Sequence, residues 1–284
     1  MESIFCTPIS LYMNLFDQIH STTSFIKQKI KQAPQIAIVL GSGLGGLIDL
    51  VDIETEIPYS EIPNFPVSTV KGHAGKLVFG TLSGKPVVMM AGRFHYYEGY
   101  TMQEITFPIR IMKALGAHTI FLSNAAGGTN HHFKIGDIML IKDHINLFPE
   151  HPLRGYNDER LGTRFPDMCE PYDINLIAAA NKIAEEKNIT IHTGIYTGLQ
   201  GPTFETKAEY KWLHTIGGDA VGMSTVPEVI VARHGEMRVF AASIITDLGL
   251  DEGLVKITHE EVLEAANEAA PRLAAIVAAL IEQI

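Results

Sequence analysis

Short apolar runs recur along the whole 284-residue chain, and glycine, serine or asparagine often ends them. The runs typical of buried strands cover residues 35–40, 76–82, 86–91, 119–123, 137–142, 190–196, 219–223 and 238–245. Patterns of helical period lie at residues 104–115, 174–187, 207–216, 227–234 and 258–284. Because strands and helices alternate, the sequence predicts an α/β fold in which helices cover both faces of a mainly parallel or mixed sheet.

No linker, internal repeat or low-complexity tract divides the chain, so we expect one domain over residues 15–284 after an N-terminal arm, 1–14, of unknown role. The formal net charge of -10 argues against nucleic-acid binding, which needs clustered Lys and Arg. We find no signal-peptide pattern and no apolar run of membrane-spanning length. Cys6 and Cys169 have no metal or redox spacing, so we expect a cytoplasmic protein without membrane contact.

The glycine-rich stretch 41–46 directly follows the first predicted strand and formally fits the dinucleotide fingerprint G-x-G-x-x-G. Only about six residues follow before the chain turns extended, whereas a parallel crossover needs about a dozen residues including its helix. The sequence therefore favours a turn whose amides, together with the Ser42 hydroxyl, surround an anion. A plain tight turn remains open, and a dinucleotide-binding protein is the alternative from another functional class.

Further polar groups follow other predicted strands, at the sheet edge where α/β proteins bind ligands. Arg93 and His95 follow the run 86–91 and can donate to an oxyanion, and His73 in Gly-His-Ala-Gly can add a third donor. Residues 123–128 are predicted to form an elbow of small residues that lets a flat ligand approach the backbone. Ser224 lies in a strand-to-helix turn suited to phosphate. A solvated loop and ordinary turns are the alternatives.

Other residues suit a purine nucleoside. Phe204 can pack on a purine ring while Glu205 accepts hydrogen bonds from its edge, although Glu205 can also be an ordinary acid at a helix start. Asp247 lies at the end of an apolar strand, which is an unusual place for a carboxylate. His259 lies in the first turn of a helix, where a neutral imidazole is favoured, so it can contact a sugar hydroxyl or simply face solvent.

Several ordered motifs share one resemblance: GSGLGGL, KGHAGKLVFG, GRFHYYEGY, NAAGG, GDIMLIKDHINL, HPLRGYNDER, GPTFET, VGMSTVPEVIVARH and THEEVL. From about Gln35 to the C-terminus, the chain resembles the trimeric class of purine nucleoside phosphorylases. The resemblance implies a mixed, partly closed sheet and a homotrimer. It also implies reversible phosphorolysis of purine ribo- and deoxyribonucleosides, above all inosine and guanosine, to the free base and (deoxy)ribose 1-phosphate. Phosphate is then a co-substrate, and no metal or organic cofactor is expected.

The resemblance also implies roles by motif position. The phosphate ligands would be Ser42, His73, Arg93, His95, the amide of Ala125, and Ser224. The ribose would contact Tyr97 and Met223, with His259 at its 5′-hydroxyl, and the base would contact Phe204, Glu205, Val221 and Asp247. Phe165 matches a phenylalanine that completes a neighbouring subunit's site, and Glu98 matches a carboxylate that orients His95 or Arg93. Asp247, His95 and Glu205 are the candidate catalytic residues.

Asp247 is a departure from this pattern, because family members restricted to 6-oxopurines have Asn at this position. Methylthioadenosine phosphorylases have Asp at a comparable place, but they lack the GRFHYYEGY and FET motifs. We expect burial to raise the pKa of Asp247, so that its acid form can donate to the leaving purine and act as a general acid. An enzyme that accepts adenosine or methylthioadenosine is therefore the alternative within the same class.

Overall fold

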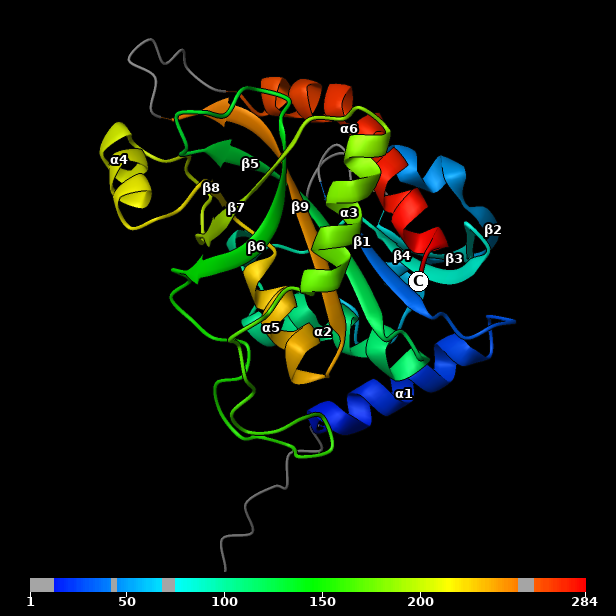
Figure 1. Cartoon of the computed structure of the whole chain (residues 1–284). Helices are drawn as coiled ribbons and strands as arrows, with labels where there is room; N and C mark the ends of the chain where they lie inside the picture. The colour runs from blue at the N-terminus through cyan, green and yellow to red at the C-terminus, as the bar shows by residue number, and fades with distance from the viewer. Residues whose placement is uncertain (1–12, 42–44, 68–74, 250–257) are drawn as a thin grey trace, which may run out of the picture.

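A computed structural model describes residues 13–41, 45–67, 75–249 and 258–284, which form one mixed sheet with helices on both faces (Figure 1). The strands are β1 Ile36–Leu40, β2 Asp52–Pro58, β3 Lys76–Leu82, β4 Lys85–Ala91, β5 Thr119–Gly128, β6 Ile138–Asn146, β7 Ile191–Gly198, β8 Ala220–Gly222 and β9 Arg238–Leu248. The α-helices are α1 Leu15–Lys27, α2 Met102–Leu115, α3 Ile174–Glu186, α4 Lys207–Thr215, α5 Val226–His234 and α6 His259–Glu282.

The sheet closes on itself at one end. Its strand order is β2-β3-β4-β1-β5-β8-β7-β6-β9, and β9 also pairs in parallel with β5 along the whole length of both strands. The strands β5, β8, β7, β6 and β9 therefore form a ring, while β2, β3, β4 and β1 extend from it as an open sheet. The predicted α/β fold with a mixed, partly closed sheet is confirmed.

Side-chain alternation along β1 explains why the helices form two layers. Ala37 and Val39 pack into the core beneath α1, α2 and α5, whereas Ile36 and Ile38 pack into the core beneath α3 and α6. Successive side chains of a strand point to opposite faces, so a continuous apolar run such as β1 requires cover on both sides. Figure 1 shows α1, α2 and α5 on one side of the sheet and α3 and α6 on the other.

The structure corrects the prediction for residues 123–128. They do not form an elbow, because β5 continues through them and stays paired with β9 as far as Gly128 and Leu248. Small side chains permit this close pairing: a Cβ on Gly128 would come within 2.9 Å of the Leu248 side chain. Ala125 is therefore a strand residue, opposite Ile244 in the β5–β9 ladder.

The glycine-rich turn after β1 does not lead into a crossover helix. Gly45–Leu50 is a short 3₁₀ helix, and the chain then enters β2, which pairs antiparallel with β3. A dinucleotide-binding unit requires a helix and a parallel strand at this point. That alternative is therefore wrong for this chain.

The helix α1 was not predicted. Its Asn14 side chain accepts a hydrogen bond from the Asp17 amide at 3.0 Å, which caps the first turn. Ile19 and Ile26 are buried in the same core cluster as the apolar residues of α2, the helix that α1 contacts. The run Ser-Thr-Thr-Ser in its middle has low helix propensity, so tertiary packing rather than local preference stabilises α1.

Candidate active site

Arg93 follows β4 directly and lies inside the protein, 1% exposed. Its Nε and Nη2 donate to the two carboxylate oxygens of Glu228 at 3.2 and 2.7 Å, and its Nη1 donates to the carbonyl oxygen of Ser123. Glu228 is in the first turn of α5 and Ser123 is in β5. The bidentate pair therefore fixes the guanidinium between two elements of the fold. Sequence analysis missed Glu228, which lies within the motif VGMSTVPEVIVARH.

His95 is held by Glu98 in the short turn after Arg93. One Glu98 carboxylate oxygen accepts a bond from the His95 amide at 2.7 Å and lies 3.2 Å from the His95 ring Nδ1. The Tyr97 ring stacks on the imidazole, with the ring centroids 4.7 Å apart. Burial lowers the pKa of His95, although Glu98 partly offsets this effect, so the imidazole is neutral at neutral pH. The contact agrees with the role expected of Glu98 toward His95.

The turn that leads into α5 is strained and firmly held. Thr225 has φ 70° and ψ -55°, and the Val226 amide donates to the Ser224 carbonyl oxygen at 2.8 Å, which defines a γ-turn. A β-branched residue in this conformation is costly and is typical of functional sites. The buried Asn124 of β5 donates to the Thr225 hydroxyl at 2.9 Å. Ser224 is thereby placed at the N-terminus of α5, where backbone amides favour an anion.

Asp247 lies in β9 and is 6% exposed. Its Oδ2 accepts a hydrogen bond from the Tyr210 hydroxyl at 2.6 Å, and its Oδ1 accepts one from the Thr246 hydroxyl at 3.1 Å. Within the described ranges it forms no ion pair with Lys, Arg or His. Burial raises the pKa of Asp247, and the two hydroxyl bonds oppose that rise. The expected direction is confirmed, and Tyr210 is a partner that sequence analysis missed.

Glu205 lies just before α4 and close to Asp247. Thr206 and Glu209 form the capping box of α4, so Glu205 is not the acid that caps this helix. Burial, and secondly the nearby Asp247 carboxylate, raise the pKa of Glu205 to about 7. Phe204, beside it, is half-exposed. Glu205 can therefore carry a proton near neutral pH, which suits a group that contacts a purine edge.

Two residues of the expected ribose region, Tyr97 and Met223, lie beside Gly201 in the fold. A Cβ on Gly201 would collide with the Met223 sulfur and lie 3.2 Å from Cδ1 of Tyr97. Val221, in contrast, is 1% exposed and packs with Tyr210 and Leu213. Val221 therefore supports Tyr210 from within the core.

The two polar ends are arranged along a single strand, β5. Ser123 and Asn124 contact Arg93 and the α5 turn, whereas Gly127 lies beside Asp247, since a Cβ there would be 2.8 Å from Asp247 Oδ2. Four residues of strand span about 13 Å. We name the Arg93–Glu228 side, with Ser224, the anion end, and the Asp247–Tyr210 side, with Glu205, the base end.

The remaining predicted residues are Ser42, His73, His259 and Phe165. Ser42 and His73 lie outside the described residues, and so does the side chain of His259, the first residue of α6. Phe165 is 85% exposed in the segment between β6 and α3. The described residues include no group of three or more His, Cys, Asp or Glu placed to hold a metal ion. They also include no helix long and apolar enough to cross a membrane.

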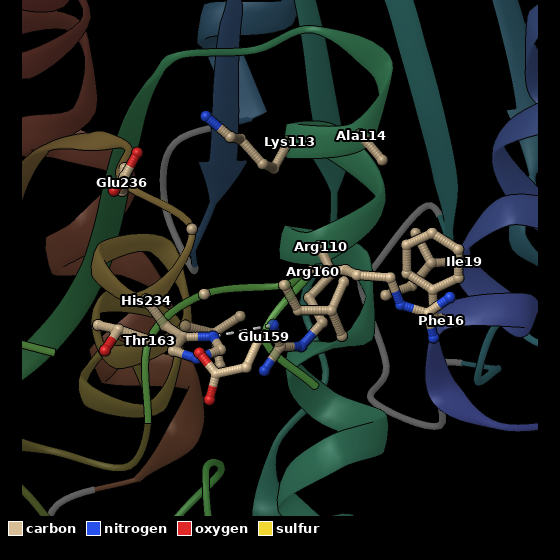
Figure 2. Close-up of a pocket in the computed structure, with 14 residues that line it drawn as sticks. Phe16, Ile19, Arg110, Lys113, Ala114, Glu159, Arg160, Thr163, His234 and Glu236 are labelled. Carbon is tan, nitrogen blue, oxygen red and sulfur yellow. Dashed lines mark hydrogen bonds between the residues drawn. The ribbon is translucent and has the colours of Figure 1, made fainter. Parts of the chain in front are cut away.

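A cavity of about 610 Å³ lies elsewhere, between α1, α2, α5 and residues 159–163. Figure 2 shows Arg110, His234 and Glu159 converging on it, and Arg110 Nη1 lies 3.3 Å from His234 Nδ1. Lys113 occupies the last turn of α2, where a cation stabilises the helix dipole, whereas burial and the nearby Arg110 lower the pKa of His234 in the last turn of α5. None of the predicted site residues lines this cavity. It is therefore separate from the candidate site.

Comparison with known proteins identifies the family. Residues 35–282 match the family model of the phosphorylase superfamily. The chain is 49% identical over 270 residues to purine nucleoside phosphorylase 1 of Bacillus subtilis, covering 94% of this chain and 98% of the relative. It is 49% identical over 278 residues to purine nucleoside phosphorylase of Bos taurus, covering 95% and 96%.

Solved structures agree with this assignment. Schistosoma mansoni purine nucleoside phosphorylase in complex with adenosine superposes with a TM-score of 0.89 at 44% identity, covering 94% of this chain and 96% of that one. The same protein in complex with inosine gives 0.89 at 43% identity, with the same coverage. The chain therefore belongs to the phosphorylase superfamily and, within it, to the purine nucleoside phosphorylases.

Proposed function

We propose that this protein cleaves purine nucleosides, with inosine and guanosine as main substrates, by reversible phosphorolysis to the free base and (deoxy)ribose 1-phosphate. The observation that carries the proposal is the two-ended site along β5. A buried guanidinium and a helix N-terminus lie at one end, and two carboxyl groups of raised pKa lie at the other. The names of its relatives and the nucleosides bound in structural neighbours support the same reaction.

The anion end suits the nucleophile. Arg93 supplies a positive charge that Glu228 holds in place, and Ser224 adds a hydroxyl at the N-terminus of α5. His95, kept neutral by burial, can donate or accept without adding charge. By resemblance, Ser42, His73 and the Ala125 amide complete the phosphate shell. Groups fixed in this way need little reorganisation during the reaction.

The base end suits the leaving group. As the bond between the anomeric carbon and the purine nitrogen loosens, positive charge develops on the ribose and the bonding electrons move into the purine. A phosphate oxygen then bonds to the anomeric carbon. A protonated Asp247 or Glu205 can donate a hydrogen bond to the electron-rich purine, which stabilises this charge. Tyr97 and Met223 would hold the ribose between the two ends, an orientation that brings the reacting atoms together.

The proposal includes a homotrimer, a cytoplasmic location, and no metal or organic cofactor. The assembly rests on the resemblance, in which Phe165 completes a neighbouring subunit's site, and the 85% exposure of this side chain leaves it accessible to such a neighbour. Phe165→Ala should then raise the KM for nucleoside and leave phosphate binding nearly unchanged. Tyr156→Ala, in the same segment and 96% exposed, is the matched control. A fully active monomer by light scattering would contradict the assembly.

The reaction is tested by incubating the protein with inosine, with and without phosphate, and coupling hypoxanthine release to xanthine oxidase. We expect uric acid only when phosphate is present, with an equal amount of ribose 1-phosphate. Uric acid formed without phosphate would indicate a hydrolase. No product from inosine, guanosine or adenosine would overturn the proposed function altogether.

A further inference from the structure

Tyr210 fills the space between three elements at the base end. It is 1% exposed in α4, and its hydroxyl lies 2.6 Å from Asp247 Oδ2. Two glycines make room for it: a Cβ on Gly127 would lie 2.6 Å from the hydroxyl, and a Cβ on Gly249 would overlap the ring. The tyrosine is therefore built into the fold, and its hydroxyl is aimed at Asp247.

The hydrogen bonds around Asp247 affect whether its side chain is ionised or protonated when a ligand binds. Tyr210 and Thr246 each donate one proton, and each uses a different carboxylate oxygen. An ionised carboxylate accepts both bonds, whereas a protonated one must give up part of its acceptor capacity. The two hydroxyls thus favour the ionised form against the effect of burial.

The form of Asp247 determines which purine it can contact. N7 is an acceptor in both kinds of purine, so the substituent at position 6 decides the preference. A 6-oxopurine presents the acceptor O6, which an ionised carboxylate repels, whereas a 6-aminopurine presents an amino group that donates to such a carboxylate. A protonated Asp247 has the opposite preference, because it donates to O6.

We propose that Tyr210 is a positioning residue that sets base preference: its bond to Asp247 stabilises the ionised, acceptor form of this carboxylate, so the pocket takes 6-aminopurine nucleosides such as adenosine through that form beside 6-oxopurine ones through the protonated form. This inference rests on the proposed function. The amino group of the substrate would use a remaining lone pair of Asp247, and Tyr210 itself need not touch the base.

Other titratable groups near Tyr210 and Asp247 are few in the described part of the chain. Glu205, before α4, interacts with the Tyr210 hydroxyl and raises the pKa of Tyr210 together with burial and Asp247. Glu209 of α4 acts on Glu205. The facing strands contribute glycine, valine and threonine, which do not titrate. The pKa of Glu205 itself differs among the variants, because Asp247→Asn removes a carboxylate that raises it and Tyr210→Phe removes a hydrogen bond that lowers it. The comparison below is therefore repeated with Glu205→Gln in each variant, which removes this second titration.

The test compares kcat/KM for adenosine and inosine between pH 5 and 9 in the wild type, Tyr210→Phe, Asp247→Asn and the double variant. Tyr210→Phe should lower the adenosine-to-inosine ratio about tenfold, the effect of one lost hydrogen bond to a charged group. Inosine turnover declines as Asp247 ionises, and Tyr210→Phe should raise the pH of this decline by about one unit. With Asn at position 247, the same Tyr210→Phe change should alter neither quantity by more than about twofold.

Two further variants separate the proposed role from a loss of stability. Thr22→Val removes a buried hydroxyl of α1 that donates to the Pro63 carbonyl oxygen at 2.8 Å, and it should leave the ratio unchanged. Thr246→Val removes the other donor to Asp247 and should shift the ratio in the same direction as Tyr210→Phe, even if Tyr210→Phe folds poorly.

An unchanged ratio in both Tyr210→Phe and Thr246→Val would overturn the inference. So would an equal shift when Tyr210→Phe is combined with Asp247→Asn, since the effect would then not pass through the carboxylate. A wild type that cleaves neither nucleoside with phosphate would instead contradict the proposed function.

Discussion

Glu228 and Asp247 are both buried carboxylates, 4% and 6% exposed, yet they have different partners. Glu228 at the anion end forms a bidentate ion pair with Arg93. Asp247 at the base end has two hydroxyl donors and, among the described residues, no cation. Glu228 is held by the opposite charge of Arg93, whereas Asp247 is held by neutral hydroxyls. An ion pair therefore fixes the carboxylate at the anion end, and neutral hydrogen bonds fix the one at the base end.

The largest expected effect comes from breaking the ion pair of Arg93 and Glu228. Arg93→Ala leaves Glu228 buried without its cation, which should lower the free energy of unfolding by about 3–5 kcal/mol. Turnover of inosine should fall at least about 100-fold, because a preorganised contact to phosphate is lost. Urea denaturation and phosphate titration measure the two effects.

A matched double variant separates stability from function. Arg93→Met combined with Glu228→Gln removes both charges, so most of the lost stability should return while turnover stays low. Recovery of wild-type dependence on phosphate concentration in this variant would show that Arg93 does not hold the anion.

At the base end, Glu205→Gln should change stability in a pH-dependent way. The pKa of Glu205 is about 7 in the fold against 4.5 ordinarily, so the folded state binds more protons between these values. This contribution to stability is complete below about pH 4.5 and is lost as pH rises through 7. As pH rises from 5 to 8, the free energy of unfolding of the variant should therefore increase by about 2 kcal/mol relative to that of the wild type. Urea denaturation at pH 5 and pH 8 measures this, and an equal difference between variant and wild type at both pH values would contradict it.

Asp247→Asn should have a smaller effect on stability, within about 1 kcal/mol, because the amide oxygen can accept from Tyr210 and the amide nitrogen can donate to Thr246. It should lower adenosine turnover about tenfold relative to inosine and remove the decline of inosine turnover at higher pH. Steady-state kinetics over a pH series measures both. A loss of stability as large as that of Arg93→Ala would contradict the claim that the two carboxylates are held in different ways.

The smallest expected effect concerns backbone strain at the anion end. Thr225→Gly removes the strain of φ 70°, and this gain offsets most of the cost of the added chain entropy and of the lost Asn124 hydrogen bond, so the free energy of unfolding should fall by only about 1 kcal/mol. The KM for phosphate should rise a few-fold, because Ser224 is held less firmly. Glu236→Gly relieves a similar positive φ of 59° after α5 and is the control. Equal phosphate KM values in both variants would leave the γ-turn without a functional role.

Local patterns predicted most of the fold. The strand predicted at 76–82 coincides with β3, and the helices predicted from residues 207 and 258 correspond to α4 and α6. The continuation of β5 through small residues could not be predicted, since it depends on pairing with β9, more than a hundred residues later. The helix α1 was missed because packing outweighs its poor intrinsic propensity.

Of the site, the sequence indicated candidate ligand-binding residues and the contact of Glu98 with His95, but not Glu228 and Tyr210, which hold Arg93 and Asp247. Glu228 is 135 residues from Arg93, and Tyr210 is 37 residues from Asp247. No local periodicity or motif spacing reports such pairs, because they form only when distant elements pack. The direction of the Asp247 pKa shift was predicted from burial alone, whereas the hydroxyls that oppose it required the structure.

A crystal structure of the protein with hypoxanthine and ribose 1-phosphate tests the two-ended site most directly. The account predicts phosphate oxygens within hydrogen-bonding distance of Arg93 and Ser224, and the purine edge at Glu205 and Asp247. A purine bound beside Arg93, or both ligands in the cavity between α1, α2 and α5, would contradict it.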